Sequence, residues 1–121
     1  MAIEKINSLN VMLLDEIGPR LGSEQDALDV IGATYGLDVD AVAIPVSRFA
    51  PDFFVLGNKQ AGHFIQKLQN YSLRLIILGD LTEAMANSKA LTDFVGETNR
   101  IGHHFFAGDR AAMEAGFGRT R

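Results

Sequence analysis

The chain has 121 residues, of which 47% are hydrophobic and 21% charged, and its formal net charge is −4 at pH 7. This composition is typical of a globular protein large enough to bury a core, and it excludes an intrinsically disordered chain. The lack of cysteine excludes disulfides, thiolate zinc sites and cysteine nucleophiles, and the mild acidity argues against general binding of nucleic acids.

The N-terminal residues carry charges within the first five positions and no apolar run of signal-peptide length. No apolar stretch approaches the roughly 20 residues that span a bilayer. We therefore expect a cytoplasmic protein without membrane contact. We expect one domain over residues 1–121, in which residues 116–121 fray because two glycines and two terminal arginines bury little.

Strand patterns recur along the chain. Residues 2–7 and 10–15 are separated by a turn-prone serine, and we expect them to pair as an antiparallel hairpin at a sheet edge. Residues 41–46 alternate valine and isoleucine with alanine and proline, which predicts a strand with two different faces. Residues 73–78 are apolar on both faces, as in a covered central strand, and residues 103–107 form the last predicted strand.

Helical patterns separate these strands. The predicted helices run over residues 23–35, over residues 59–71, from Thr82 or Ser88 onward, and from a cap at Asp109 through Met113. In the first of them, Leu28, Ile31 and Tyr35 recur at spacings of three and four, which predicts that they share its apolar face.

Alternation of strands and helices predicts the α/β class, with parallel strands joined by crossover helices. We expect a four-stranded, mainly parallel sheet with an antiparallel N-terminal edge strand. A doubly wound, flavodoxin-like three-layer sandwich is the alternative. The two-sided apolar strands, with Phe105 and Phe106 near the end of the sheet, also predict self-association, most simply as a homodimer.

Polar residues follow the predicted strands at the edge where ligands of parallel α/β sheets bind. Arg48 follows the strand at 41–46, Asp80 the strand at 73–78 and Asp109 the last strand, so the three could form a polar site. In the simpler alternative both aspartates cap helices and Arg48 pairs with a surface acid.

A second candidate surface is the connecting segment 47–58 with the polar face of the helix after it. Ser47 and Asp52 belong to the segment, and Gln66 and Asn70 to the helix face. The phenylalanines of this region are expected in the core, since aromatic residues near a helix are usually buried.

The sequence lacks the residues that several kinds of functional site require. The glycines at 57 and 62 have phosphate-loop spacing, but His63 and Phe64 follow where lysine and a hydroxyl residue are needed. His103 and His104 are neighbours in a predicted strand, so they point to opposite faces and do not form one metal site. No serine lies in a nucleophile elbow. We therefore expect no metal, no cofactor and no catalytic residues.

The run APDFFVLGNKQAGHFIQKLQNYSLRLIILGD, with the SEQDALDVIG helix start, resembles a bacterial family of unknown function, number 4180. The resemblance covers most of the chain and departs at His63, where the family usually has an acid. It implies a one-domain cytoplasmic protein of bacteria and no particular reaction.

The order of elements is also similar to that of STAS (anti-sigma-factor-antagonist) and STAS-like domains, which bind proteins and are often switched by phosphorylation at a helix start. The nearest hydroxyl here is that of Ser47, without the Asp-Ser signature of those domains. Our first hypothesis is thus a non-catalytic module that binds a protein partner or has a regulatory role. The alternative is a small-ligand-binding domain or minor enzyme with a polar site at the carboxyl ends of the strands.

Overall fold

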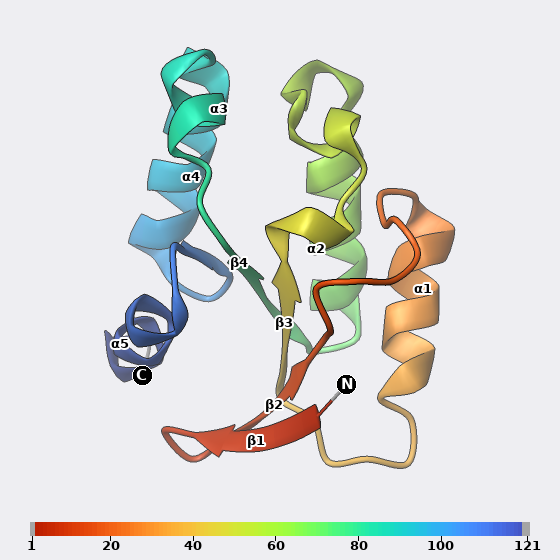
Figure 1. Cartoon of the computed structure of the whole chain (residues 1–121). Coiled ribbons are helices and arrows are strands. Elements are labelled where there is room, and N and C mark those ends of the chain that lie inside the picture. Colours follow the sequence, from red (N-terminus) through yellow and green to blue (C-terminus); the bar gives the residue numbers. More distant parts are fainter. Residues whose placement is uncertain (1, 120–121) are drawn as a thin grey trace.

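The computed structural model describes residues 2–119 and is built on a five-stranded sheet in the order β1-β2-β3-β4-β5 (Figure 1). The strands are β1 (Ala2–Ile6), β2 (Leu9–Leu13), β3 (Ala41–Pro45), β4 (Arg74–Leu78) and β5 (Phe105–Ala107). β1 pairs with β2 antiparallel, and every later pair is parallel. The prediction of a mainly parallel α/β sheet with an antiparallel N-terminal edge strand is confirmed.

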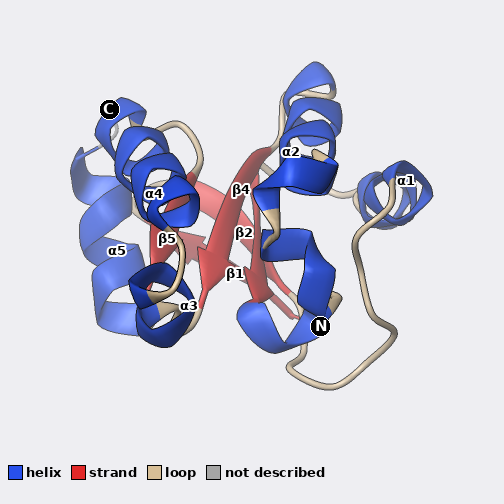
Figure 2. Cartoon of the chain, turned by 90° about the horizontal axis from the view of Figure 1, so that it is seen from above, coloured by secondary structure: helices blue, strands red, loops and turns tan. Residues whose placement is uncertain are grey.

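Helices cover both faces of the described sheet. They are α1 (Glu24–Ala33), α2 (Gln60–Asn70), α3 (Thr82–Ala86), α4 (Lys89–Ile101) and α5 (Arg110–Arg119). Strands β2 to β5 are added in chain order, so right-handed crossovers leave α1, α2 and α4 on the same face. Helix α5 covers the opposite face (Figure 2). The strand order never reverses, so the doubly wound alternative is wrong.

The two faces of the sheet carry separate cores, as the alternation in the sequence predicted. In β3, Val42 and Ile44 belong to the core beneath α1 and α2, whereas Ala41 and Ala43 belong to the core beneath α5. Ile76 of β4 faces α5 as well, between neighbours that face the other way. The second face is therefore covered within the chain.

Helix α1 buries a different face from the one that its sequence suggested. Ala27, Val30 and Ile31 are its buried residues, whereas Leu28 is partly exposed and Tyr35, which lies beyond the helix end, is 69% exposed. The small Ala27 is fully buried on this face. Side-chain size at the contact, which hydrophobic spacing ignores, decides which face is buried.

The C-terminal helix is longer than predicted. We expected it to end near Met113 and residues 116–121 to fray, but α5 continues to Arg119 and Phe117 is only 3% exposed. The ring of Phe117 packs edge-on against that of Phe105, with centroids 5.2 Å apart. A glycine precedes Phe117, and a Cβ at that position would collide with the Phe105 ring. Residues 120 and 121 lie outside the described residues.

Candidate functional site

Two loops meet at the carboxyl ends of β2 and β3. The loop between β2 and α1 runs alongside residues 46–50, where the Leu21 N–H donates to the Arg48 carbonyl (2.7 Å) and the Ala50 N–H to the Leu21 carbonyl (2.8 Å). These two bonds form a short parallel bridge outside the main sheet. The loop pair is thus held by backbone contacts between segments nearly 30 positions apart, which local sequence patterns cannot reveal.

The loops enclose the side chain of Arg48, which is only 9% exposed. Its Nε donates to the Pro19 carbonyl (3.1 Å) and its Nη1 to the Asp15 carbonyl (3.0 Å). Gly18 packs against the guanidinium so closely that a Cβ there would lie 2.6 Å from Cζ. A guanidinium has five N–H groups, so three remain after these two bonds. Among residues 2–119, Nη2 has no hydrogen-bond partner and no carboxylate forms an ion pair with Arg48.

Arg48 forms part of the wall of a pocket of about 270 Å³, which we name the Arg48 pocket. Its other lining residues come from β2, the following loop and α1: Met12, Leu14, Asp15, Pro19, Leu21, Asp26, Asp29, Val30 and Ala33. The α1 residues recur at positions i, i+3, i+4 and i+7, which places them on one side of the helix. The pocket combines an apolar wall with a buried cation and lies at the sheet edge where a polar site was expected.

The two aspartates of α1 differ in what holds them. The Asp26 carboxylate accepts hydrogen bonds from the backbone N–H groups of Gly22 (2.9 Å) and Ser23 (3.0 Å), as part of a capping box. Burial opposes ionisation of Asp26, but these bonds outweigh it and hold its pKa below the usual value. Asp29 is exposed, and only its Oδ1 is engaged, by the side chain of Gln25 (3.0 Å). Among residues 2–119, Oδ2 of Asp29 has no partner.

The other two members of the expected polar site do not join Arg48. Asp80 accepts a hydrogen bond from the backbone N–H of Thr82 (2.8 Å) and lines a separate pocket of about 170 Å³ at the ends of β4 and β5. The hydrogen bonds from Thr82, first from its side chain, lower the pKa of Asp80. Asp109 accepts from the Ala112 N–H (2.8 Å) at the start of α5. The simpler alternative assigned both aspartates to helix caps, and Asp109 does cap α5, whereas Asp80 lies one residue before the N-cap of α3. The surface acid that this alternative assigned to Arg48 is absent from the described residues.

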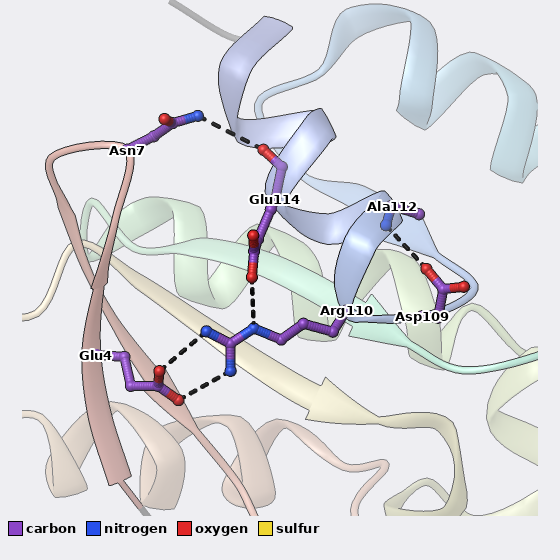
Figure 3. Close-up of polar contacts among 6 residues, drawn as sticks. All are labelled: Glu4, Asn7, Asp109, Arg110, Ala112 and Glu114. Atoms are coloured by element: carbon purple, nitrogen blue, oxygen red, sulfur yellow. Dashed lines mark hydrogen bonds and ion pairs between the residues drawn. The ribbon is translucent and has the colours of Figure 1, made fainter.

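Arg110, next to Asp109, joins α5 to the N-terminal hairpin (Figure 3). Its guanidinium donates to both carboxylate oxygens of Glu4 (2.9 and 3.0 Å) and to Glu114 (2.8 Å). Asn7, in the turn of the hairpin, donates to the Glu114 carbonyl (3.5 Å). The group bridges segments far apart in the sequence and is exposed, so we assign it a structural role.

The remaining candidate residues lie apart from the guanidinium. Ser47 is next to Arg48 in sequence, but its hydroxyl donates to the Glu16 carbonyl (3.0 Å) on the outside of the loop pair. Asp52 is exposed. Gln66 and Asn70 are exposed on α2 and bond to each other (2.9 Å). The structure does not bring these four residues into the Arg48 pocket.

The phenylalanines of the connecting segment belong to the core, as predicted. Phe49 and Phe53 stack with ring centroids 4.2 Å apart, and both meet Phe64 of α2 edge-on. All three are buried. The segment is therefore anchored from beneath, and it leads from Arg48 to α2 as a fixed surface.

The sequence matches one known protein family. The family model described as Domain of unknown function (DUF4180) matches residues 6–116. The chain belongs to this family. The matched part contains every residue of the Arg48 pocket in this DUF4180 domain. Searches of curated proteins and of solved structures found no match, so the looser likeness to STAS-like domains has no support beyond the order of elements.

A second pocket of the DUF4180 domain, of about 360 Å³, was not anticipated from the sequence. It lies between α2 and α4, and we name it the amide pocket after its two glutamines; it is lined by Gly62, Ile65, Gln66, Gln69, Phe94, Thr98, Ile101, His103 and His104. Only Gln66 had been singled out as a binding residue. Loop residues before β5 meet the far end of α2 here, and no sequence spacing signals that contact.

His104 closes the bottom of the amide pocket. Its Nδ1 accepts a hydrogen bond from the Leu75 N–H (2.9 Å), so its proton lies on Nε2, which donates to Oε1 of Gln69 (3.0 Å). Burial, with smaller contributions from His103 and Arg74, lowers the pKa of His104 to about 4. The residue is thus a satisfied, neutral core histidine. The predicted strand starts later than expected, at Phe105, so the assignment of both histidines to a strand is wrong.

Two findings concern metal binding and membrane spanning. In residues 2–119, no group of three or more histidines and acids is placed to hold a metal ion. No helix in the same part of the chain is long and apolar enough to cross a bilayer.

Proposed function

We propose that this DUF4180 domain is a non-catalytic binding module that holds the carboxylate of a small molecule in the Arg48 pocket. The observation that carries the proposal is the buried guanidinium of Arg48, which has no anionic partner among the described residues. We place its action in the bacterial cytoplasm, where occupation of the pocket would report the level of its ligand.

The physical reason is the cost of an uncompensated buried charge. Removing a cation from water is unfavourable unless an opposite charge and hydrogen bonds replace the water. Two backbone carbonyls supply part of that replacement for Arg48, which also lines the pocket. A carboxylate matches a guanidinium in planar geometry and can accept two parallel hydrogen bonds. Met12, Leu14 and Val30 offer an apolar wall to the rest of the ligand.

The composition of the pocket favours binding over catalysis. Its lining contains no serine, histidine, lysine or tyrosine among the described residues, so it offers no side-chain nucleophile besides carboxylates. Asp26 is engaged by the helix cap, and its lowered pKa suits it poorly to proton transfer near neutral pH.

The test is a thermal-shift screen of small carboxylic acids, with and without an amino group, followed by titration calorimetry. A ligand at tenfold its Kd stabilises the folded state by about 1.4 kcal/mol, which raises the Tm by roughly 5–6 °C in a domain of this size. The R48M variant should lose binding. R20M is the matched control, since Arg20 lies in the same loop, is exposed, and only donates to the Phe49 carbonyl (3.2 Å). Equal binding by wild type and R48M would refute the proposal.

A second candidate function is protein binding through the segment 47–58 and the Gln66–Asn70 face. One observation favours it: Val55 is 59% exposed on a segment that phenylalanines anchor from beneath, so an apolar side chain is held out on a fixed surface. A partner captured by the wild-type chain and lost with V55D would support this function. Capture unaffected by V55D would count against it.

We also keep the homodimer as a proposal, although Phe105 and Phe106, which motivated it, pack against Phe117 and Phe94 within the chain. The free edge of β1 is the remaining feature of the described sheet that supports it. Light scattering over a range of concentrations tests it, and a monomer mass throughout would refute it.

A further inference from the structure

We infer that the ligand of the Arg48 pocket is a zwitterion, an α-amino acid with an aliphatic side chain. The inference rests on the proposed function and names the class of ligand. Its basis is that Asp29, whose Oδ2 has no partner among residues 2–119, lines the same pocket as Arg48. A simple carboxylate would satisfy Arg48 alone, whereas a ligand with its own ammonium group would also meet the charge of Asp29.

Asp29 is the residue placed to receive the ammonium group. It lies one turn after Asp26 on the pocket side of α1, and it is exposed at the rim. Oδ1 accepts a hydrogen bond from Gln25, which fixes the carboxylate, and Oδ2 has no partner among residues 2–119. Asp26 is less suited, because two backbone N–H groups and the helix start already compensate its charge.

The two charged ends therefore differ in depth. Arg48 is buried and would take the carboxylate inside the loop pair, and Asp29 is exposed and would take the ammonium group nearer to solvent. Val30 and Ala33 follow Asp29 on the same side of the helix and face the pocket together with Met12. This wall has no polar side chain, so it suits a branched aliphatic group. A volume of about 270 Å³ limits the ligand to a small molecule.

The arrangement also explains the loop that covers the guanidinium. Gly18 lies against the guanidinium of Arg48, whose Nε donates to the Pro19 carbonyl and whose Nη1 donates to the Asp15 carbonyl. Nη2, which has no partner among residues 2–119, is left for the ligand. The protein thus fixes the orientation of the guanidinium before the ligand arrives, which reduces the ordering cost of binding.

The experiment compares probes that share one apolar group and differ only in charge. Alanine, valine and leucine are titrated first by calorimetry, and the tightest binder is compared with its deaminated acid and its amide. For leucine these are 4-methylpentanoate, which lacks the ammonium group, and leucinamide, which lacks the carboxylate. We expect each loss of one charge to weaken binding by about tenfold or more.

Two variants assign the charges to residues. D29N should weaken binding of the amino acid by about tenfold and leave that of the deaminated acid unchanged or improved, because it removes one negative charge. R48M should weaken both. D93N is the matched control, since Asp93 is an exposed acid of α4 that pairs with Lys89 (2.9 Å) away from the pocket, and it should bind as wild type does.

The outcomes separate the two proposals. If the deaminated acid binds as tightly as the amino acid, or if D29N weakens neither, the zwitterion is refuted while carboxylate binding at Arg48 stands. If neither the amino acids nor the acids bind, or if R48M binds them like wild type, the proposed function fails and the inference fails with it.

Discussion

Acidification should destabilise this domain through one buried side chain, His104. Its pKa lies near 4 in the folded chain, against 6.5 for an unperturbed histidine. A lowered pKa in the folded state means that stability is complete above the unfolded pKa and is lost as the pH falls toward the folded one. The loss therefore begins near pH 6.5 and is complete near pH 4.

The size of the effect follows from the two pKa values. At about pH 5 the unfolded imidazole is protonated in all but roughly one molecule in 30, whereas the folded one is protonated in about one in ten. The resulting factor of about 30 in the folding equilibrium corresponds to about 2 kcal/mol. Protonation of the folded state is costly because a proton on Nδ1 would face the Leu75 N–H, which now donates to that atom.

Urea unfolding followed by circular dichroism, at about pH 7.5 and about pH 5, measures this loss. H104Q should unfold at lower urea at both pH values, but its stability should fall with pH by about 2 kcal/mol less than that of the wild type. An equal pH dependence in the wild type and H104Q would refute the reasoning, as would an NMR titration of His104 with a midpoint above 6.5.

Three further substitutions test other parts of the structure. G18A would place a Cβ 2.6 Å from Cζ of Arg48 and displace the guanidinium. Calorimetry should therefore show ligand binding at least about tenfold weaker than in the wild type, while the free energy of unfolding stays within about 1 kcal/mol of the wild-type value. Unchanged binding would contradict this prediction. F53A removes a fully buried ring, and urea unfolding should show a loss of about 3–5 kcal/mol, whereas a loss below about 1 kcal/mol would mean that the cluster is not packed as described. E4Q weakens the pair between Glu4 and Arg110, so amide hydrogen exchange should accelerate in β1 but not in β3. A β1 exchange rate unchanged from the wild type would contradict this role.

Much of the fold was predictable because strand alternation and helix spacing are local properties. The assignment of Val42 and Ala43 to opposite faces of β3 needed only a period of two. The C-terminal helix was not predictable in the same way, because its glycines disfavour a helix locally and its terminal arginines bury little. Its last turns are stabilised by Phe117 against Phe105, a contact between elements.

The candidate site was predictable only in part, for a similar reason. Arg48 was identified by its place after a strand, a rule of parallel sheets. Arg48 is distinctive because the carbonyls of Asp15 and Pro19 accept hydrogen bonds from its side chain. These contacts depend on two loops that meet in space. Asp80 and Asp109 occupy equivalent places after their strands, and both are engaged by backbone N–H groups at the starts of α3 and α5. Position after a strand selects candidates, and the burial and pairing of each charge decide among them.

The core beneath α5 has a consequence for how the chain reaches its native state. Ile6 and Phe117 both belong to it, and they lie roughly 110 positions apart, so closing it orders almost the whole chain at once. Until α5 docks, β3 and β4 present Ala43 and Ile76 to water. A newly made chain that lacks α5 would expose this apolar face, so we expect the nascent protein to depend on chaperones or on rapid release of its C-terminus to avoid aggregation.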